Sequence, residues 1–189
     1  AGPFATLAPS SHRPQGSRWL LAVSCCGMAT AVCPGSFDPF TRGHRYVVER
    51  AAGRFDEVVV TVVVNPNKSG MFSVDERIAL IEEDCADLPN VRVDRWTGLL
   101  VDYLTENSYS TIVKGLRSGV DFDYEVPMAQ MNRELSDVET VFLLTDPRYA
   151  HVSSSLVKEV AKLGGDVSPF LSGHIHERLM AAVTGQRKV

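Results

Sequence analysis

The segment 57–65, EVVVTVVVN, contains seven successive β-branched residues. Residues of this kind favour the pleated backbone of a strand. A strand with one wet face alternates apolar and polar side chains, and this run has no such alternation, so both of its faces must be buried. Strands buried on both faces occupy the centre of parallel sheets that helices cover on either side. The segment therefore favours an α/β architecture above any other.

Shorter β-branched runs recur along the chain, and amphipathic segments separate them. The predicted strands are 29–33, 57–65, 91–95, 111–114 and 140–144, and the predicted helices are 43–54, 74–86, 100–107, 124–135, 154–163 and 174–183. This alternation is typical of repeated βα units. We expect a single Rossmann-like doubly wound domain over 28–189, with a five-stranded parallel sheet. Such sheets bind ligands beyond the carboxyl ends of the strands, where the strand order reverses.

Residues 1–27 differ in composition from the rest of the chain. They are rich in Ala, Ser, Pro and Gly, contain no acidic residue and show no sustained period. We expect a disordered leader or upstream extension, with Met28 at the beginning of the folded part. A signal peptide is the alternative, but cleavage near Ala31 would cut through the first predicted strand.

The composition excludes several classes of protein. A formal net charge of -4 is ordinary for a soluble domain and is not a nucleic-acid-binding balance. No apolar run approaches the roughly 18 residues that a membrane span needs. Four cysteines without a CxxC pair indicate neither a zinc site nor a disulfide framework. We expect a soluble cytoplasmic protein that binds neither nucleic acid nor membrane.

A turn-rich segment, 33–44 (CPGSFDPFTRGH), connects the first predicted strand to the first predicted helix. Gly35 allows the backbone to approach a ligand closely, and Ser36 offers a hydroxyl and an amide. Gly43 and His44 open the helix, whose free amides and positive dipole end attract phosphate. His44 there could give a hydrogen bond or a charge to an oxygen that becomes negative. The residues alone fit equally a phosphate site and a tight surface loop in which His44 caps the helix.

The loops after the second and third predicted strands are less informative. Lys68 lies in a polar loop, where it could reach a phosphate as a mobile point charge or could remain a solvated side chain. Leu100 follows the third strand, where it could line an apolar wall of an acceptor site or belong to the core.

Two cations, Lys114 and Arg117, lie at the end of the fourth predicted strand. Cations that follow a buried strand are costly to leave unpaired, so an anionic partner is expected. That partner is either a bound phosphate or an internal carboxylate, Asp121 or Asp123.

Three successive hydroxyls, Ser153, Ser154 and Ser155, precede the helix predicted after the fifth strand. Ser153 and Ser154 suit a helix N-cap. Hydroxyls next to free helix amides also form an anion-binding site. A plain cap and a second phosphate site are both compatible with these residues.

Three segments resemble known nucleotidyltransferases. GSFDPFTRGH is similar to the GxFDPxxxGH signature of the adenylyltransferase and cytidylyltransferase superfamily. KGLRSGVDFDYE and VSSSLVKEVAKLGGDV resemble the corresponding regions of the phosphopantetheine adenylyltransferase family more closely than those of other members, especially its actinobacterial branch. The resemblance covers 28–183, essentially the whole predicted domain.

The resemblance implies an activity and its partners. Enzymes of this family transfer the adenylyl group of ATP to 4'-phosphopantetheine, giving dephospho-coenzyme A and pyrophosphate in the penultimate step of coenzyme A biosynthesis. Mg2+ accompanies the ATP through its phosphates, without metal ligands from the protein. The family also forms homohexamers, which nothing in the sequence indicates independently.

The resemblance further implies the functional residues. It places 4'-phosphopantetheine at Ser36, Lys68, Leu100 and Lys114. It places ATP at Ser36, Phe37, His44, Gly115, Leu116, Arg117, Glu125, Tyr149, Ala150, His151, Val152, Ser153, Ser154 and Ser155. His44 is then the group that stabilises the transition state, with Lys68 and Arg117 orienting and neutralising the phosphates.

Three positions depart from the commonest family pattern. Ser36 stands for a more usual Thr and Lys114 for a frequent Arg, changes that keep the hydroxyl and the charge. His151 occupies a place where an aromatic residue is common.

Two other functions are alternatives. One is a superfamily member with a different small acceptor, against which KGLRSGVDFDYE and VSSSLVKEVAKLGGDV argue. The other is a noncatalytic nucleotide sensor, against which the presence of His44, Lys68, Lys114 and Arg117 argues.

Overall fold

The computed structural model describes residues 29–64, 66 and 69–186. The predicted leader, Met28 and Lys68 lie outside the described residues. The strands are β1 (Thr30–Gly35), β2 (Glu57–Val64), β3 (Val91–Thr97), β4 (Thr111–Leu116) and β5 (Glu139–Leu144). The helices are α1 (Arg42–Ala52), α2 (Val74–Asp84), α3 (Leu100–Glu106), α4 (Gly119–Ser136), α5 (Ser154–Lys162) and α6 (Gly173–Gln186), with the short 3-10 helices η1 (Pro147–Tyr149) and η2 (Ser168–Phe170).

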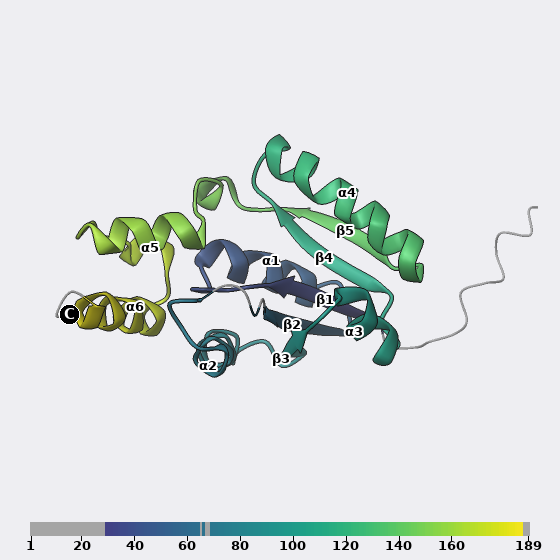
Figure 1. Ribbon diagram of the computed structural model, residues 1–189, viewed down its shortest axis with the longest axis horizontal. Helices are drawn as coiled ribbons and strands as arrows, with labels where there is room; N and C mark the ends of the chain where they lie inside the picture. Colours follow the sequence, from purple (N-terminus) through teal and green to yellow (C-terminus); the bar gives the residue numbers. More distant parts are fainter. Residues whose placement is uncertain (1–28, 65, 67–68, 187–189) are drawn as a thin grey trace, which may run out of the picture.

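The five strands form one parallel sheet in the order β3-β2-β1-β4-β5 (Figure 1). This confirms the predicted fold class. The valine-rich strand β2 lies between β1 and β3, in the interior of the sheet, as its lack of alternation predicts. The chain first builds outward from β1 to β3 and then returns to place β4 on the other side of β1. The strand order therefore reverses between β1 and β4.

Both faces of the sheet are covered by helices. Alternate valines of β2 show this: Val58, Val60 and Val62 belong to a core with residues of α1, α2, α5 and α6, whereas Val59 packs with Tyr103 and Leu104 of α3. Helix α4 covers β4 and β5 (Figure 1). The continuous apolar run of β2 is thus explained by burial on either side.

Some boundaries differ from the predicted ones. Strand β1 continues two residues beyond the predicted end, because Pro34 and Gly35 still pair with Thr61 and Val62 of β2. Helix α4 begins at Gly119, five residues before its predicted start. The reason is a cap, since the Ser118 hydroxyl accepts a hydrogen bond from the Asp121 amide. Neither of the 3-10 helices was expected.

No helix within the described part of the chain combines the length and the apolar character that crossing a membrane requires.

Candidate active site

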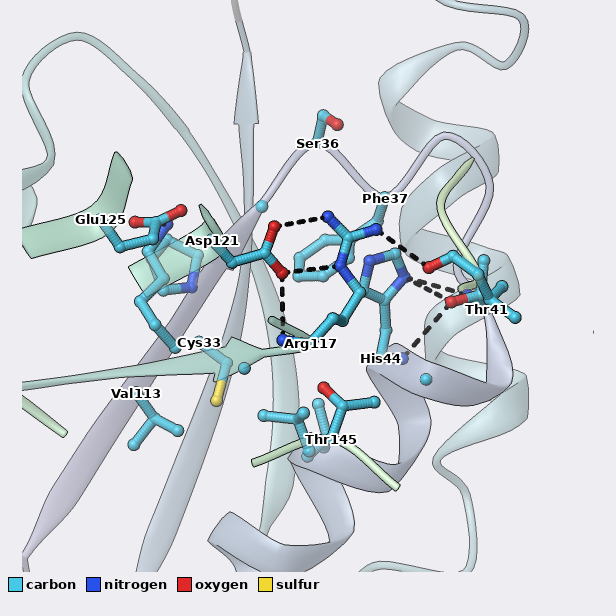
Figure 2. A pocket seen from close by; sticks show the side chains of 18 residues that line it. Cys33, Ser36, Phe37, Thr41, His44, Val113, Arg117, Asp121, Glu125 and Thr145 are labelled. Carbon is cyan, nitrogen blue, oxygen red and sulfur yellow. Dashed lines mark hydrogen bonds and ion pairs between the residues drawn. The ribbon is translucent and has the colours of Figure 1, made fainter. Parts of the chain in front are cut away.

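A pocket opens at the carboxyl ends of β1 and β4, where the strand order reverses (Figure 2). Doubly wound sheets place their ligands at this point, so the position agrees with the sequence-based expectation. The pocket is lined by the ends of both strands, the beginning of α1 and the beginning of α4. Its lining residues are Cys33, Pro34, Gly35, Ser36, Phe37, Thr41, Gly43, His44, Val47, Val48, Val113, Lys114, Gly115, Arg117, Asp121, Glu125, Thr145 and Val152.

His44 is the third residue of α1 and closes a reciprocal cap with Thr41. The backbone amide of His44 donates to the Thr41 hydroxyl at 3.4 Å, and the backbone amide of Thr41 donates to Nδ1 of His44 at 3.0 Å. Because Nδ1 accepts a hydrogen bond, the neutral imidazole carries its proton on Nε2. The two functions left open for His44, helix cap and phosphate contact, therefore use different ring nitrogens and are compatible.

The surroundings of His44 keep its imidazole neutral. Its ring lies 5.2 Å from the Phe37 ring and 5.6 Å from the Phe40 ring, measured between centroids. Burial, together with the positive charge of Arg117, lowers the pKa of His44 to about 4. Near neutral pH His44 can thus donate one hydrogen bond from Nε2 but brings no charge.

Phe37 lies beneath His44 with its ring buried in the core. Its φ of 47° is in the left-handed region, which is uncommon for residues other than Gly. A Cβ atom on Gly35 would lie 2.7 Å from Cζ of Phe37, so Gly35 makes room for this ring. Gly35 also lines the pocket, so this packing role stands beside the expected approach of a ligand. What Phe37 can offer a ligand is its backbone.

The two cations at the end of β4, Lys114 and Arg117, both pair with carboxylates of this protein. Arg117 forms a 2.9 Å ion pair with Asp121, and its Nη1 donates to the carbonyl of Val152 (Figure 2). Lys114 lies 3.3 Å from a carboxylate oxygen of Glu125. Of the two carboxylates expected as internal partners, Asp121 pairs with Arg117, whereas Lys114 pairs with Glu125, which was not expected in this role. A bound phosphate would therefore compete with α4 for both cations.

Asp38 was not expected to have a role, yet it joins three segments around the site. Its side chain is buried and accepts hydrogen bonds from the amides of Met71 and Phe72, each at 2.9 Å, and from Lys158 of α5 at 2.6 Å. Burial alone would raise the pKa of Asp38, but these hydrogen bonds outweigh it and hold the pKa below the ordinary value. Two sequence signals pointed to Asp38: it is a carboxylate within the apolar stretch FDPF, and it occupies a fixed position of the GxFDPxxxGH signature.

The three serines after η1 serve α5 in different ways. Ser153 caps the helix by accepting a hydrogen bond from the amide of Leu156. The Ser154 hydroxyl donates to the carbonyl of Pro39 at 2.7 Å and so ties α5 to the segment before α1. Ser155 is exposed. The predicted capping role is confirmed for Ser153. The hydrogen bond of Ser154 keeps the start of α5 close to the start of α1.

Several predicted residues do not line the pocket. Leu100 packs against the core formed with α3, and Leu116 is buried. Tyr149 packs against the core on the α1 side, and the exposed His151 makes an edge contact with Phe170. The pocket lining likewise omits Ala150, Ser153, Ser154 and Ser155. The structure brings together Ser36, Phe37, His44, Lys114, Gly115, Arg117, Glu125 and Val152 from the predicted set.

Gly115 has a structural reason of its own. A Cβ atom at this position would lie 2.6 Å from Cγ2 of Val47, so the glycine allows β4 to pack closely against α1. Val47 and Gly115 both line the pocket, so this contact forms part of its wall. It accounts for the glycine without any ligand.

Within the described residues, no three His, Cys, Asp or Glu side chains are grouped so that they could hold a metal ion. The buried carboxylate of Asp38 already accepts hydrogen bonds from a lysine and two backbone amides. Hard cations prefer oxygen ligands, which a bound phosphate would bring to this site.

Comparison with known proteins agrees with this geometry. Residues 32–160 match the cytidylyltransferase-like family. A phosphopantetheine adenylyltransferase of Corynebacterium diphtheriae is 61% identical over 145 residues, which are 76% of this chain and 91% of that protein.

Solved structures share the fold. A nicotinic acid mononucleotide adenylyltransferase of Plasmodium falciparum superposes with a TM-score of 0.59 at 12% identity, over 85% of this chain and 96% of that one. A bifunctional NMN adenylyltransferase/ADP ribose pyrophosphatase of Francisella tularensis gives 0.60 at 14% identity, over 82% of this chain and 53% of that one. The fold, the family match and the identity to the Corynebacterium protein agree, and the chain belongs to the phosphopantetheine adenylyltransferase family within the cytidylyltransferase-like superfamily.

Proposed function

We propose that this protein transfers the adenylyl group of ATP to 4'-phosphopantetheine, giving dephospho-coenzyme A and pyrophosphate. The observation that carries the proposal is the 61% identity to a phosphopantetheine adenylyltransferase over 91% of that protein's length. The pocket supports it, because a neutral donor and two cations converge at the strand switch point. This reaction is a step of coenzyme A biosynthesis.

The transfer is a direct displacement at phosphorus. An oxygen of the acceptor phosphate forms a bond to the α-phosphorus of ATP, while the bond from that phosphorus to the bridging oxygen of the leaving pyrophosphate breaks. The leaving oxygen keeps the electron pair, and no covalent intermediate with the protein is needed. Both reactants are polyanions, so positioning and neutralisation of charge supply most of the catalysis.

His44 is the proposed stabiliser of the transition state. Its Nε2–H is left free by the cap at Nδ1 and is directed by a ring that packs against Phe37 and Phe40. A fixed neutral donor of this kind gains strength as negative charge grows on the oxygens of the five-coordinate phosphorus. It needs no reorientation during the step.

The cations orient and neutralise the phosphates. Arg117 presents a planar fork with five donors, and Lys114 presents a point charge. We assign Arg117 and Glu125 to ATP, Lys114 to the acceptor, and Ser36 to both. Lys68 is proposed as a further cation for both catalysis and acceptor binding. When phosphates enter, the pairs with Asp121 and Glu125 must loosen or be shared.

The remaining contacts are proposed from the family. ATP is also assigned to Phe37, Gly115, Leu116, Val152, the stretch Tyr149–His151 and the serines 153–155 at the start of α5, where free amides favour phosphate. Leu100 is assigned to the acceptor. Mg2+ supplies charge neutralisation through the phosphates of ATP, which are its ligands of choice.

The protein is proposed to form a homohexamer in the cytoplasm. One face of α4 exposes apolar residues at helical spacing: Val120, Tyr124, Met128, Met131 and Leu135. The neighbouring strand β5 exposes Val141 and Leu144. An apolar surface of this kind suits contact with further copies of the chain. The buried free thiols of Cys33 and Cys85 suit a reducing compartment.

The decisive experiment follows pyrophosphate release by residues 28–189 with ATP, Mg2+ and 4'-phosphopantetheine. We expect release that depends on the acceptor and is matched by formation of dephospho-coenzyme A. Nicotinic acid mononucleotide serves as the control acceptor and should give no product. Turnover of the control acceptor alone would assign the protein to another activity of the superfamily. ATP binding without turnover of either acceptor would indicate a nucleotide sensor.

A further inference from the structure

The most buried arginine next to the site is not among the pocket residues. Arg77 lies in the first turn of α2 with a side chain only 10% exposed. Its Nε and Nη2 donate to the carbonyl of Phe72 at 2.9 and 2.7 Å, and its Nη1 donates to the carbonyl of Ser36 at 3.2 Å. Asp38 provides the counter-charge at 3.7 Å. The guanidinium therefore spans the loop before α2 and the loop after β1.

The space for this guanidinium depends on Gly70. A Cβ atom on Gly70 would lie 1.7 Å from Nη2 of Arg77 and 2.8 Å from its Cζ. Any other residue would have to displace the guanidinium. Asp38 binds the same loop by accepting hydrogen bonds from the amides of Met71 and Phe72. Gly70 and Asp38 thus keep in place the guanidinium of Arg77, which donates to the carbonyl oxygen of Ser36.

The orientation of this carbonyl determines the orientation of the next amide. In a trans peptide the C=O and N–H bonds point to opposite sides, so the Phe37 amide faces away from Arg77. Ser36 and Phe37 line the pocket, whereas Arg77 does not. Phe37 has a left-handed backbone, a conformation that costs energy and persists only where its surroundings enforce it. Arg77 restrains this peptide through its hydrogen bond to the Ser36 carbonyl.

We propose that Arg77 is a positioning residue for adenylyl transfer: through the Ser36 carbonyl it keeps the Ser36–Phe37 peptide turned so that the Phe37 amide serves the phosphates in the pocket. Arg77 does not line the pocket, so the proposed role is indirect. The proposal rests on the proposed function, because it names a residue that prepares the same site. Amides fixed in advance stabilise developing charge better than amides that must reorient.

Two variants test this from different directions. Arg77→Lys keeps the charge but loses the planar fork, so it cannot serve the Phe72 and Ser36 carbonyls with the same geometry. Gly70→Ala keeps Arg77 and displaces its guanidinium. We expect kcat to fall by about tenfold or more in both variants, while the KM for ATP changes by less than about threefold. Arg178→Lys is the matched control, because Arg178 of α6 pairs with Glu76, the neighbour of Arg77 in α2, and does not line the pocket. The kcat of this variant should equal the wild-type value.

Thermal unfolding, measured alongside, separates positioning from folding. A fall in kcat per folded molecule supports the proposal, and a kcat that falls only with the folded fraction overturns it. Unchanged kcat in either folded variant also overturns it, and if Arg77→Lys does not fold, Gly70→Ala decides. Wild-type protein that releases no pyrophosphate with 4'-phosphopantetheine would refute the proposed function instead, which keeps the two failures distinct.

Discussion

Nδ1 of His44 accepts a hydrogen bond from the backbone amide of Thr41 at 3.0 Å, so the helix cap itself leaves the imidazole proton on Nε2. The capping role uses one nitrogen and leaves the other for a ligand. Local helix chemistry and proposed catalysis are joined in one side chain. This relationship makes the two contributions separable by mutation.

Replacing His44 by Asn should keep the cap and remove the donor, because the Asn side chain can place an acceptor near Nδ1 but nothing near Nε2. We expect kcat to fall by at least about a hundredfold, the usual size for loss of one transition-state donor, while the Kd for ATP changes by only a few fold. His44→Ala should lose a similar factor in kcat and, in addition, some helix stability. Rapid-quench kinetics and calorimetric ATP binding measure both quantities, and a wild-type kcat in His44→Asn would remove His44 from catalysis.

The pKa of His44 predicts how the protein responds to acid. Burial lowers this pKa to about 4, below the ordinary value of 6.5, so the folded state resists protonation. The corresponding stability is fully present above pH 6.5 and is lost as the pH falls toward 4. Between pH 7 and 5, the Tm of the wild type should therefore fall more than that of His44→Asn. Parallel Tm curves for the two proteins would contradict the lowered pKa. The part of kcat that depends on His44 should be flat from about pH 6 to 8.

Asp121 should compete with ATP for Arg117. The pair is partly exposed, so its removal is worth little for folding, but it occupies the fork that the phosphates need. We expect Asp121→Asn to bind ATP about two- to fivefold more tightly at low salt. Its kcat should fall, because Arg117 loses a group that orients it.

Asp123→Asn is the matched control for Asp121, since it removes the same charge from an exposed position of the same helix. Titration calorimetry at two salt concentrations distinguishes local competition from the general effect of net charge. Equal gains in affinity for the two variants would show that the Arg117 pair does not limit ATP binding.

Asp38 should contribute more to the free energy of unfolding than an aspartate in an exposed ion pair does. Asp38→Asn leaves the ammonium of Lys158 and the buried guanidinium of Arg77 without their counter-charge. Loss of one partner of a buried pair costs about 3 kcal/mol, which urea denaturation can measure as a lower midpoint at unchanged slope. Asp87→Asn, in an exposed pair with Arg45, should change the free energy of unfolding little. Comparable midpoints for both variants would refute the central role of Asp38.

The elements could be predicted largely from local patterns. The β-branched run of β2 and the amphipathic pattern of each helix depend on residues that are close together in the sequence. The start of α4 could not be predicted in this way, because SGVDFDYE is polar enough to be read as a loop until the Ser118 cap is seen. The position of the pocket followed from the fold class, since every parallel strand of a doubly wound sheet ends at the same edge.

What the sequence by itself determined is the set of groups available at that edge: His44 at a helix start, the cations at the end of β4 and the serines at the start of α5. Only the tertiary structure decided how these groups are engaged. Charge pairing, burial and tautomer depend on atoms that are distant in sequence, as with Asp38 and Lys158, which lie 120 residues apart and 2.6 Å from each other. Arg77 and the Ser36 carbonyl are likewise 41 residues apart. Local patterns carry no information about such pairs, because their energy arises only when folding removes both partners from water.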